Sequence, residues 1–554
     1  MLGAARPVSK CDRRADPFLI ALLVIAAILV LWRLDDAYLW QDEAETALVA
    51  RHLLQFGLPL SSDGRVWVQQ SGAPFVEFTR NHVWIYHSWL QYALAALSFA
   101  VLGFSTVAAR LPFALVGLAT IAALYGFARR WMRDQRIARI ATALLVFNVP
   151  FVLLQRQCRY YGLAALFTLL TVDAYLRLRQ GRTWAVAYLV LASVLLYHSH
   201  YGAFFPTLVA LGLHTLMSRP ERRVWGQGLT AAGVVAALTV PWAIFMQVSN
   251  RGQPWQMDRF VAHIGQDLLY LTGWVVPLPF LGLMAVLWFD WLPRRYGWLL
   301  SARQKDLLLL SGLLTGSTVL VLSGTAAFDW AFFRYLVQLV PILMIVLAAL
   351  IVWVMNHWPT VAYALLILLV TSNLLHVAPY AVVAQAFSTH TSSGDRLDLS
   401  QLRPGVEGFR ALDEVWTRAS RFRSDLWMYL QELTHDYVGP NEGLVAYLST
   451  RSSPGQTLAV NYEDLPLGFY TDLRVVGGLG QHGLTSGSSP DWVVIRRHGP
   501  YRDLLEGIVA RGPYIREELP YPDIRWENRP EPGSHQYLTP QGQGPVVIYW
   551  RREP

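Results

Sequence analysis

The stretch that decides the fold is "PFLIALLVIAAILVLWRLDDAYLWQDEAETALVA", Pro17–Ala50. Its first half is an apolar run of the length that a membrane-spanning helix needs, and we expect a span from about Phe18 to Leu34. The run is longer than the apolar core of a signal peptide and no A-x-A site follows it, so we expect an uncleaved first helix. The acidic residues Asp42 and Glu43 follow directly, where the chain leaves the membrane.

The composition indicates a multi-pass membrane protein. Of the 554 residues 54% are hydrophobic and 15% are charged, against about 25% charged in soluble domains. The formal net charge of +8 suggests nucleic acid in a soluble protein, but here the basic residues cluster in short loops between apolar runs. That pattern is the orientation signal of a membrane protein, so no nucleic-acid partner is expected. Cys11 and Cys158 fall on opposite sides of the predicted topology, so we expect no disulfide.

The basic loops set the topology. Four basic residues precede the first helix and place the N-terminus in the cytoplasm: Arg6, Lys10, Arg13 and Arg14. The first outer loop then runs over about residues 35–109. If "SWLQYALAALSFAVLGF" (Ser88–Phe104) spanned the membrane, the basic cluster Arg129–Arg139 would lie outside. We therefore expect Ser88–Phe104 to lie along the membrane or dip into it.

With that placement the later basic loops fall on the cytoplasmic side and the less basic loops on the outer side. The apolar runs then give about eleven membrane helices. The last spans are expected near Tyr335–Val354 and Val361–Ala378, which ends a transmembrane domain of residues 1–385. From residue 386 to 554 apolar runs shorten, and we expect one extracytoplasmic α/β domain. There "NEGLVAYLSTRSSPGQTLAVNYEDL" predicts helix, turn and strand, "DWVVIRR" and "PVVIYWRR" predict strands, and "YRDLLEGIVARG" predicts a helix between them. We expect this protein in a bacterial inner membrane.

The predicted topology collects polar side chains at the ends of helices on the outer face. The set comprises Asp42, Glu43, Glu45, Arg51, His82, His87, Arg156, Arg159, Tyr160, Tyr161, His198, His200, Tyr201, Asp329, Arg334 and Tyr335. Carboxylates can take a proton from an attacking hydroxyl, and arginines bind phosphate through paired hydrogen bonds and stabilise charge on a leaving group. This set suits attack on a sugar that is joined to a lipid phosphate.

At these positions the chain resembles the polyprenyl-phosphate-sugar glycosyltransferases of the C-type fold. These enzymes are related to the protein O-mannosyltransferases and aminoarabinose transferases of glycosyltransferase family 39. The matching segments are "WQDEAETA" (Trp40–Ala47), "GFSTVAARLP" (Gly103–Pro112), "QRQCRYYGL" (Gln155–Leu163), "YHSHYG" (Tyr197–Gly202) and "FRYLVQLVP" (Phe333–Pro341). The resemblance implies a polyprenyl-phosphate-linked sugar donor and transfer that inverts the anomeric centre. It also implies Asp42 as the catalytic base, with Glu43 beside it to orient the base or the acceptor.

The chain departs from that family at two places. Many relatives have a second carboxylate in the segment where this chain has Gln155, Gln157 and Cys158. Many also have a phosphate-binding lysine in the first outer loop, but this chain has no lysine between Asp42 and Arg110. We expect Arg156, Arg159, Arg334 and Tyr335 to bind the donor phosphate instead. Neither the Trp-Trp-Asp motif of oligosaccharyltransferases nor an inserted lumenal repeat domain is present, so the extracytoplasmic acceptor stays open: a glycan, a lipid or a protein.

Each assignment has a structural alternative. Asp42 and Glu43 can cap a helix, and Glu45 is expected to be a solvated or capping residue. Arg156 and Arg159 can be interface anchors, whereas Arg110 is expected to be structural and to pair with an acid of the first outer loop.

Four further residues are expected at the substrate: His198, His200, Tyr160 and Tyr161. The two-residue spacing of the histidines does not fix a metal site, and a lipid monophosphate leaving group does not require a metal. No cofactor is therefore expected, although a divalent ion stays open. Glu463 and Asp464 are interpreted as a solvated turn, with an acceptor contact as the alternative.

Other functions compete with glycosyl transfer. A transporter or flippase for a lipid-linked sugar more often has inverted repeats with broken helices in matching halves, and the sequence shows no such symmetry. A non-catalytic scaffold would leave the acidic and basic residues of the outer face without a role.

Overall fold

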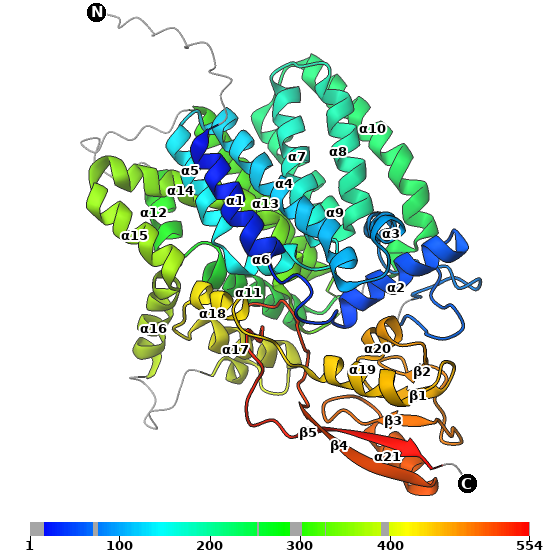
Figure 1. Cartoon of the computed structure of the whole chain (residues 1–554). Coiled ribbons are helices and arrows are strands. Elements are labelled where there is room, and N and C mark those ends of the chain that lie inside the picture. The colour runs from blue at the N-terminus through cyan, green and yellow to red at the C-terminus, as the bar shows by residue number, and fades with distance from the viewer. Residues whose placement is uncertain are drawn as a thin grey trace, which may run out of the picture.

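The computed structural model describes residues 16–69, 76–251, 254–288, 302–326, 328–388 and 398–552. A bundle of helices occupies most of the molecule, and a small sheet with its own helices lies at one end, which we call the sheet end (Figure 1). The basic residues before the first helix, and Arg294 and Arg295 of a predicted cytoplasmic loop, lie outside the described residues.

The first half of the bundle begins with α1 and ends with α10. Its helices are α1 (Pro17–Leu31), α2 (Gln41–Phe56), α3 (Leu90–Leu102), α4 (Thr106–Met132), α5 (Gln135–Val146), α6 (Val149–Gln155), α7 (Tyr161–Arg179), α8 (Ala185–Ser199), α9 (Tyr201–Ser218) and α10 (Arg222–Phe245). The second half contains α11 (Met257–Trp274), α12 (Leu278–Trp288), α13 (Ala302–Gly324), the 3-10 turns η3 (Phe333–Tyr335) and η4 (Val337–Leu339), α14 (Val340–His357), α15 (Pro359–Thr371) and α16 (Leu374–Ser388).

The apolar helices make this a membrane protein. Within the described ranges, 5 helices are long and apolar enough to cross a bilayer: α4, α7, α10, α13 and α14 with the preceding turn. The bent pairs α5–α6, α11–α12 and α15–α16 raise this to 8 if each pair is one span, and α1, α3 and α8 are shorter apolar helices. The number of about eleven spans stays a prediction.

Helix α3 is short and packs in the apolar core that it shares with α2 and the sheet. Arg139 in the basic cluster forms a 2.9 Å ion pair with Asp16 at the start of α1, so the cluster and the start of α1 lie at the same end. The 13-residue α3 is too short for a span, and it is seen nearly along its axis in Figure 1, where α7, α8 and α10 run lengthwise.

The predicted span Val361–Ala378 is not one straight helix. The chain bends by 87° between α15 and α16. Asn373 lies at the break, where its side-chain nitrogen donates to the carbonyl of Arg421 at 2.7 Å and its side-chain oxygen accepts from the backbone N–H of Arg423 at 2.8 Å. These contacts replace helical hydrogen bonds and fix the bend.

The sheet has the order β2-β1-β3-β5-β4 and is mixed. Its strands are β1 (Thr457–Val460), β2 (Arg474–Gly477), β3 (Trp492–Val494), β4 (Tyr514–Pro522) and β5 (Pro545–Arg551). Strand β1 pairs in parallel with β2 and β3, whereas β5 is antiparallel to β3 and β4. The predicted helices and strands are present as α19 (Pro440–Arg451), β1, β3, α21 (Arg502–Arg511) and β5. Strands β2 and β4 and the short helix α20 (Asp464–Tyr470) were not predicted.

The part of the chain after residue 386 does not form a separate body. Helices α17 (Glu407–Ala419) and α18 (Asp425–Glu432) pack against α11 and α15, and their apolar side chains belong to the core of the bundle. The sheet shares a second apolar core with α2 and α3, in which Leu48 and Trp84 lie with Val460 and Ile548. The sheet domain is therefore packed firmly on the first outer loop.

A buried charge cluster stabilises the sheet domain. Arg496, 1% exposed, donates from Nε to Asp523 at 2.7 Å and forms an ion pair with Glu463. The nearby Glu527 accepts from the backbone N–H of Asn441 at 3.0 Å. Burial, together with the negative charge of Glu463, raises the pKa of Glu527 to about 8 from an ordinary value of 4.5.

We expect Glu527→Gln to stabilise the protein at neutral pH. Between these pKa values the folded chain holds a proton that the unfolded chain has released, so the free energy of unfolding falls as pH rises through this window. The amide removes that dependence, and the gain at pH 7.5 reaches up to about 4 kcal/mol. Thermal unfolding of the detergent-solubilised chain at pH 5 and pH 7.5 checks this, with the exposed Glu506→Gln as control. An equal loss of stability at both values would contradict it.

Candidate active site at the sheet end of the bundle

The carboxylates of Asp42 and Glu43 point to different partners because neighbouring residues on a helix do not face each other. Both lie in the first turn of α2, and the preceding Trp40 makes no side-chain cap. The indole N–H of Trp40 instead donates to Gln157 at 2.6 Å, and the backbone N–H of Leu39 donates to the hydroxyl of Tyr470 at 3.0 Å. The entry to α2 is thus fixed from both the bundle and the sheet domain.

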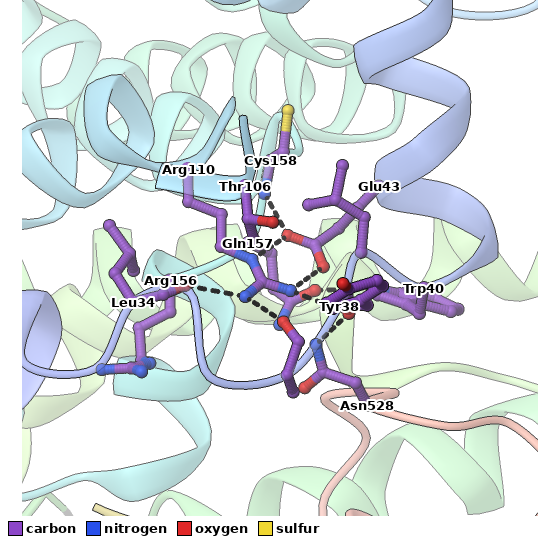
Figure 2. Close-up of polar contacts among 12 residues, drawn as sticks. Leu34, Tyr38, Trp40, Glu43, Thr106, Arg110, Arg156, Gln157, Cys158 and Asn528 are labelled. Carbon is purple, nitrogen blue, oxygen red and sulfur yellow. Dashed lines mark hydrogen bonds and ion pairs between the residues drawn. The ribbon is translucent and has the colours of Figure 1, made fainter. Parts of the chain in front are cut away.

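Glu43 and Arg110 form the centre of the polar network in Figure 2. The guanidinium binds both carboxylate oxygens, at 2.8 and 2.7 Å, and also donates to the carbonyls of Leu34 and Ala37, each at 2.8 Å. The backbone N–H of Cys158 donates to the same carboxylate at 2.7 Å. Glu43 is 0% exposed, and through Arg110 it holds the loop that leads into α2.

Glu45 is buried, and its interpretation as a solvated or capping residue is wrong. It is 0% exposed, and it accepts from Arg159 at 2.9 Å and from the hydroxyl of Tyr92 at 3.0 Å. Arg159 also donates to Thr46 at 3.0 Å and to Nε2 of His87 at 3.1 Å. Glu45 lies one helical turn after Asp42, so both carboxylates face Arg159.

Asp42 is the accessible carboxylate of this group. Its side chain is 14% exposed, and an oxygen lies 3.1 Å from Nη1 of Arg334 and 3.8 Å from Nη2 of Arg159. Arg334 is itself 9% exposed and lies over the rings of Phe332 at 4.4 Å and Tyr335 at 5.5 Å. The structure therefore brings the predicted Asp42, Arg159, Arg334 and Tyr335 together from α2, the α6–α7 turn and η3.

Arg156 lies apart from this group. Its guanidinium donates to the carbonyls of Leu29, Val30, Trp32 and Arg33 at 2.8–3.2 Å, and so binds the end of α1. These contacts direct the guanidinium toward α1 and not toward Asp42. The phosphate contact expected for Arg156 stays a prediction.

An aromatic wall borders the group. The imidazole of His200 stacks between Tyr160 at 4.3 Å and Tyr335 at 5.7 Å, and these rings line a cavity of about 220 Å³. Burial and the charge of Arg159 lower the pKa of His200 to about 3, so its ring is neutral. Tyr161 is fully buried next to Tyr160. His198 packs on Trp242 instead and is not among the residues that line the cavity.

The sheet domain also contributes to the site. In the loop between β4 and β5, Glu531 accepts from the backbone N–H of Phe333 at 3.1 Å and lies 3.7 Å from Arg334. The interpretation of Glu463 and Asp464 as a solvated turn is wrong, since both are buried. Asp464 accepts from Gln41 at 2.9 Å beside Asp42, and burial raises the pKa of Asp464 to about 6.

The arrangement can perform acid–base chemistry and can bind an anionic group of a ligand at the same place. A partly exposed carboxylate stands beside guanidinium groups, and a cavity with neutral aromatic and imidazole walls adjoins them. Among the described residues no group of three His, Cys, Asp or Glu side chains is arranged to hold a metal ion.

We expect neutralisation of Glu43 to destabilise the protein more than neutralisation of the adjacent Asp42. Glu43→Gln leaves the buried Arg110 without its counter-ion and lowers the stability of the protein by about 3–5 kcal/mol. Asp42→Asn costs less stability, because Arg159 keeps its 2.9 Å ion pair with Glu45 and Arg334 keeps Glu531 at 3.7 Å. The unfolding temperatures of the two solubilised variants distinguish these effects. Similar losses for both would show that Glu43 has no special structural role.

The chain shares its fold with solved membrane glycosyltransferases. No protein-family model matches it, and no curated protein matches its sequence. ArnT from Cupriavidus metallidurans is similar in structure in its apo state, with a TM-score of 0.55 and 16% identity over 96% of this chain and 97% of ArnT. ArnT bound to undecaprenyl phosphate gives a TM-score of 0.54 and 15% identity over the same shares. The oligosaccharyltransferase of Archaeoglobus fulgidus matches more distantly, with a TM-score of 0.44 and 12% identity over 90% of this chain and 69% of the other. The chain therefore has the C-type glycosyltransferase fold that the sequence predicted.

Proposed function

We propose that this protein is a membrane glycosyltransferase that moves a sugar from a polyprenyl phosphate to an acceptor hydroxyl. The observation that carries the proposal is the position of Asp42, an accessible carboxylate held beside Arg334 and Arg159 at the sheet end of the bundle. The shared fold supports it, because ArnT holds undecaprenyl phosphate.

The acceptor loses its proton to Asp42. A carboxylate acts as a general base when its oxygen reaches the hydroxyl, and the partial exposure of Asp42 allows that approach. The acceptor oxygen then forms a bond to the anomeric carbon of the sugar from the face opposite the phosphate. The bond from that carbon to the phosphate oxygen breaks, its electron pair stays on the phosphate, and the anomeric configuration inverts.

Arginines stabilise the phosphate as it leaves. Arg334 and Arg159 are buried beside Asp42, where a guanidinium acts more strongly on developing charge than it does in water. The charge on Asp42 is neutralised when it takes up the proton, which frees Arg334 to bind the phosphate. No cofactor is required by this reaction, because the chain's own residues supply the base and the positive charge.

The sugar occupies the cavity next to the aromatic wall. Stacked rings give an apolar surface, and a neutral His200 supplies one hydrogen-bond donor and one acceptor without a charge that would compete for the phosphate. Tyr335 joins the two parts of the site, since it lines the cavity and lies beside Arg334.

The orientation follows from the charges. Arg130, Arg139 and Arg179 lie at the end of the bundle opposite the sheet, in ion pairs with Asp173, Asp16 and Asp306. By the positive-inside rule that end is cytoplasmic, so we place the site and the sheet domain outside a bacterial inner membrane. A transporter would need its polar groups near the membrane centre, and a scaffold has no need of an accessible Asp42.

Asp42→Asn should abolish transfer without preventing donor binding. Loss of a general base costs about 10²–10⁴-fold in rate, and Arg159 and Arg334 remain to hold the phosphate. Envelope lipids, glycans and proteins from strains with no gene, the wild-type gene or the variant gene at matched membrane levels are compared by mass spectrometry. A sugar-sized mass should return with the wild type alone and identify the acceptor.

Asp472→Asn is a matched control for that comparison, since it makes the same change at a carboxylate that is 82% exposed and pairs with Arg65. If Asp42→Asn restored the same masses as the wild type, Asp42 would not be the base, and transport or scaffolding would become the better account.

A further inference from the structure

We propose that Arg529, from the sheet domain, binds the phosphate of the lipid donor and completes the anion site that Arg159 and Arg334 begin. This inference rests on the proposed function, and it makes the sheet domain part of the donor site.

The loop that holds Arg529 is fixed on the bundle from both sides. Before it, the side-chain amide of Asn528 donates to the carbonyl of Tyr38 at 3.1 Å, in the loop that leads into α2 (Figure 2). After it, Glu531 accepts from the backbone N–H of Phe333 at 3.1 Å. His535 binds the carbonyl of Arg529 at 2.9 Å and the carboxylate of Glu432 at 2.9 Å. Arg529 is therefore held at the site by its neighbours and not by its own side chain.

The guanidinium of Arg529 shares an aromatic ring with that of Arg334. They lie 5.0 and 4.4 Å from the ring centre of Phe332. Burial and the charge of Arg334 lower the pKa of Arg529. Two like charges at one ring repel each other unless an anion lies near both. The arrangement thus favours a ligand that is negatively charged.

Among the residues that the structure describes, no carboxylate forms an ion pair with Arg529. Its guanidinium makes no ion pair or side-chain hydrogen bond with another described residue, and its Nε atom is buried. Asp42 and Glu531 are near enough to raise the pKa of Arg529, but their ion pairs are with other arginines. Asp42 pairs with Arg334 and Arg159, and Glu531 pairs with Arg334. Arg529 is half-buried, and a guanidinium that is partly removed from water is stabilised when an anion binds beside it.

A phosphate is the anion that fits this geometry. The guanidinium group of arginine binds two oxygens of a phosphate through paired, charge-assisted hydrogen bonds. The phosphate must also lie within reach of Asp42, where the sugar is transferred, and Arg334 contacts Asp42 and shares Phe332 with Arg529. One phosphate can therefore contact Arg334 and Arg529 while its sugar faces Asp42.

Binding of undecaprenyl phosphate, undecaprenol and inorganic phosphate to the full chain in nanodiscs tests the inference. Arg529→Gln should weaken the binding of undecaprenyl phosphate by about 10- to 100-fold, which is the effect of losing one pair of charge-assisted hydrogen bonds. It should leave undecaprenol within about twofold, because the tail contacts are unchanged, and Arg529→Lys should recover part of the loss. Arg525→Gln is the matched control, since Arg525 lies over Trp526 at 3.9 Å in the same loop but is exposed.

The outcomes separate the inference from the proposed function. If Arg529→Gln keeps the wild-type preference for undecaprenyl phosphate over undecaprenol, or weakens both equally, Arg529 does not bind the phosphate. If the wild type binds inorganic phosphate as tightly as the lipid, the anion is not a lipid headgroup. If the wild type shows no preference for the phosphorylated lipid, the proposed function itself fails.

Discussion

The bidentate ion pair between Glu43 and Arg110 is the contact on which the site depends. Arg110 lies in the second turn of α4 and binds the carbonyls of the loop between α1 and α2 as well as the carboxylate. Because the pair is buried, its loss is costly and its geometry is fixed. With Glu43 held toward Arg110, the adjacent Asp42 must point to Arg334. One acid of the motif is thus buried in an ion pair, while its neighbour stays accessible beside Arg334.

Much of the fold could be predicted from two simple signals. Apolar runs identified most of the helices, and the positive-inside rule placed Arg129–Arg139 at the same end as the start of α1, which the Arg139–Asp16 ion pair confirms. Alternating and apolar patterns identified β1, β3 and β5. Among the site residues, Asp42, Arg159, Arg334 and Tyr335 could be grouped because each follows or precedes a helix at the predicted outer face.

The remaining features depend on tertiary contacts that no local pattern encodes. Glu45 is buried because Arg159 reaches it from another helix, and Arg156 is bound by the carbonyls at the end of α1. Glu531 and Arg529 reach Phe332 from a loop far along the sequence. The break at Asn373 is likewise set by the backbone at residues 421–423. In each case the contact comes from a distant part of the chain, and the local sequence does not identify it.

A cryo-electron microscopy structure of the full chain in nanodiscs with undecaprenyl phosphate would test the central claim most directly. The account predicts phosphate density between Arg334 and Arg529, within hydrogen-bond reach of both, with Asp42 facing the position from which the sugar would be transferred. Density for the phosphate at another place, such as the apolar groove between α8 and α10, with Arg334 still bound to Asp42, would contradict it.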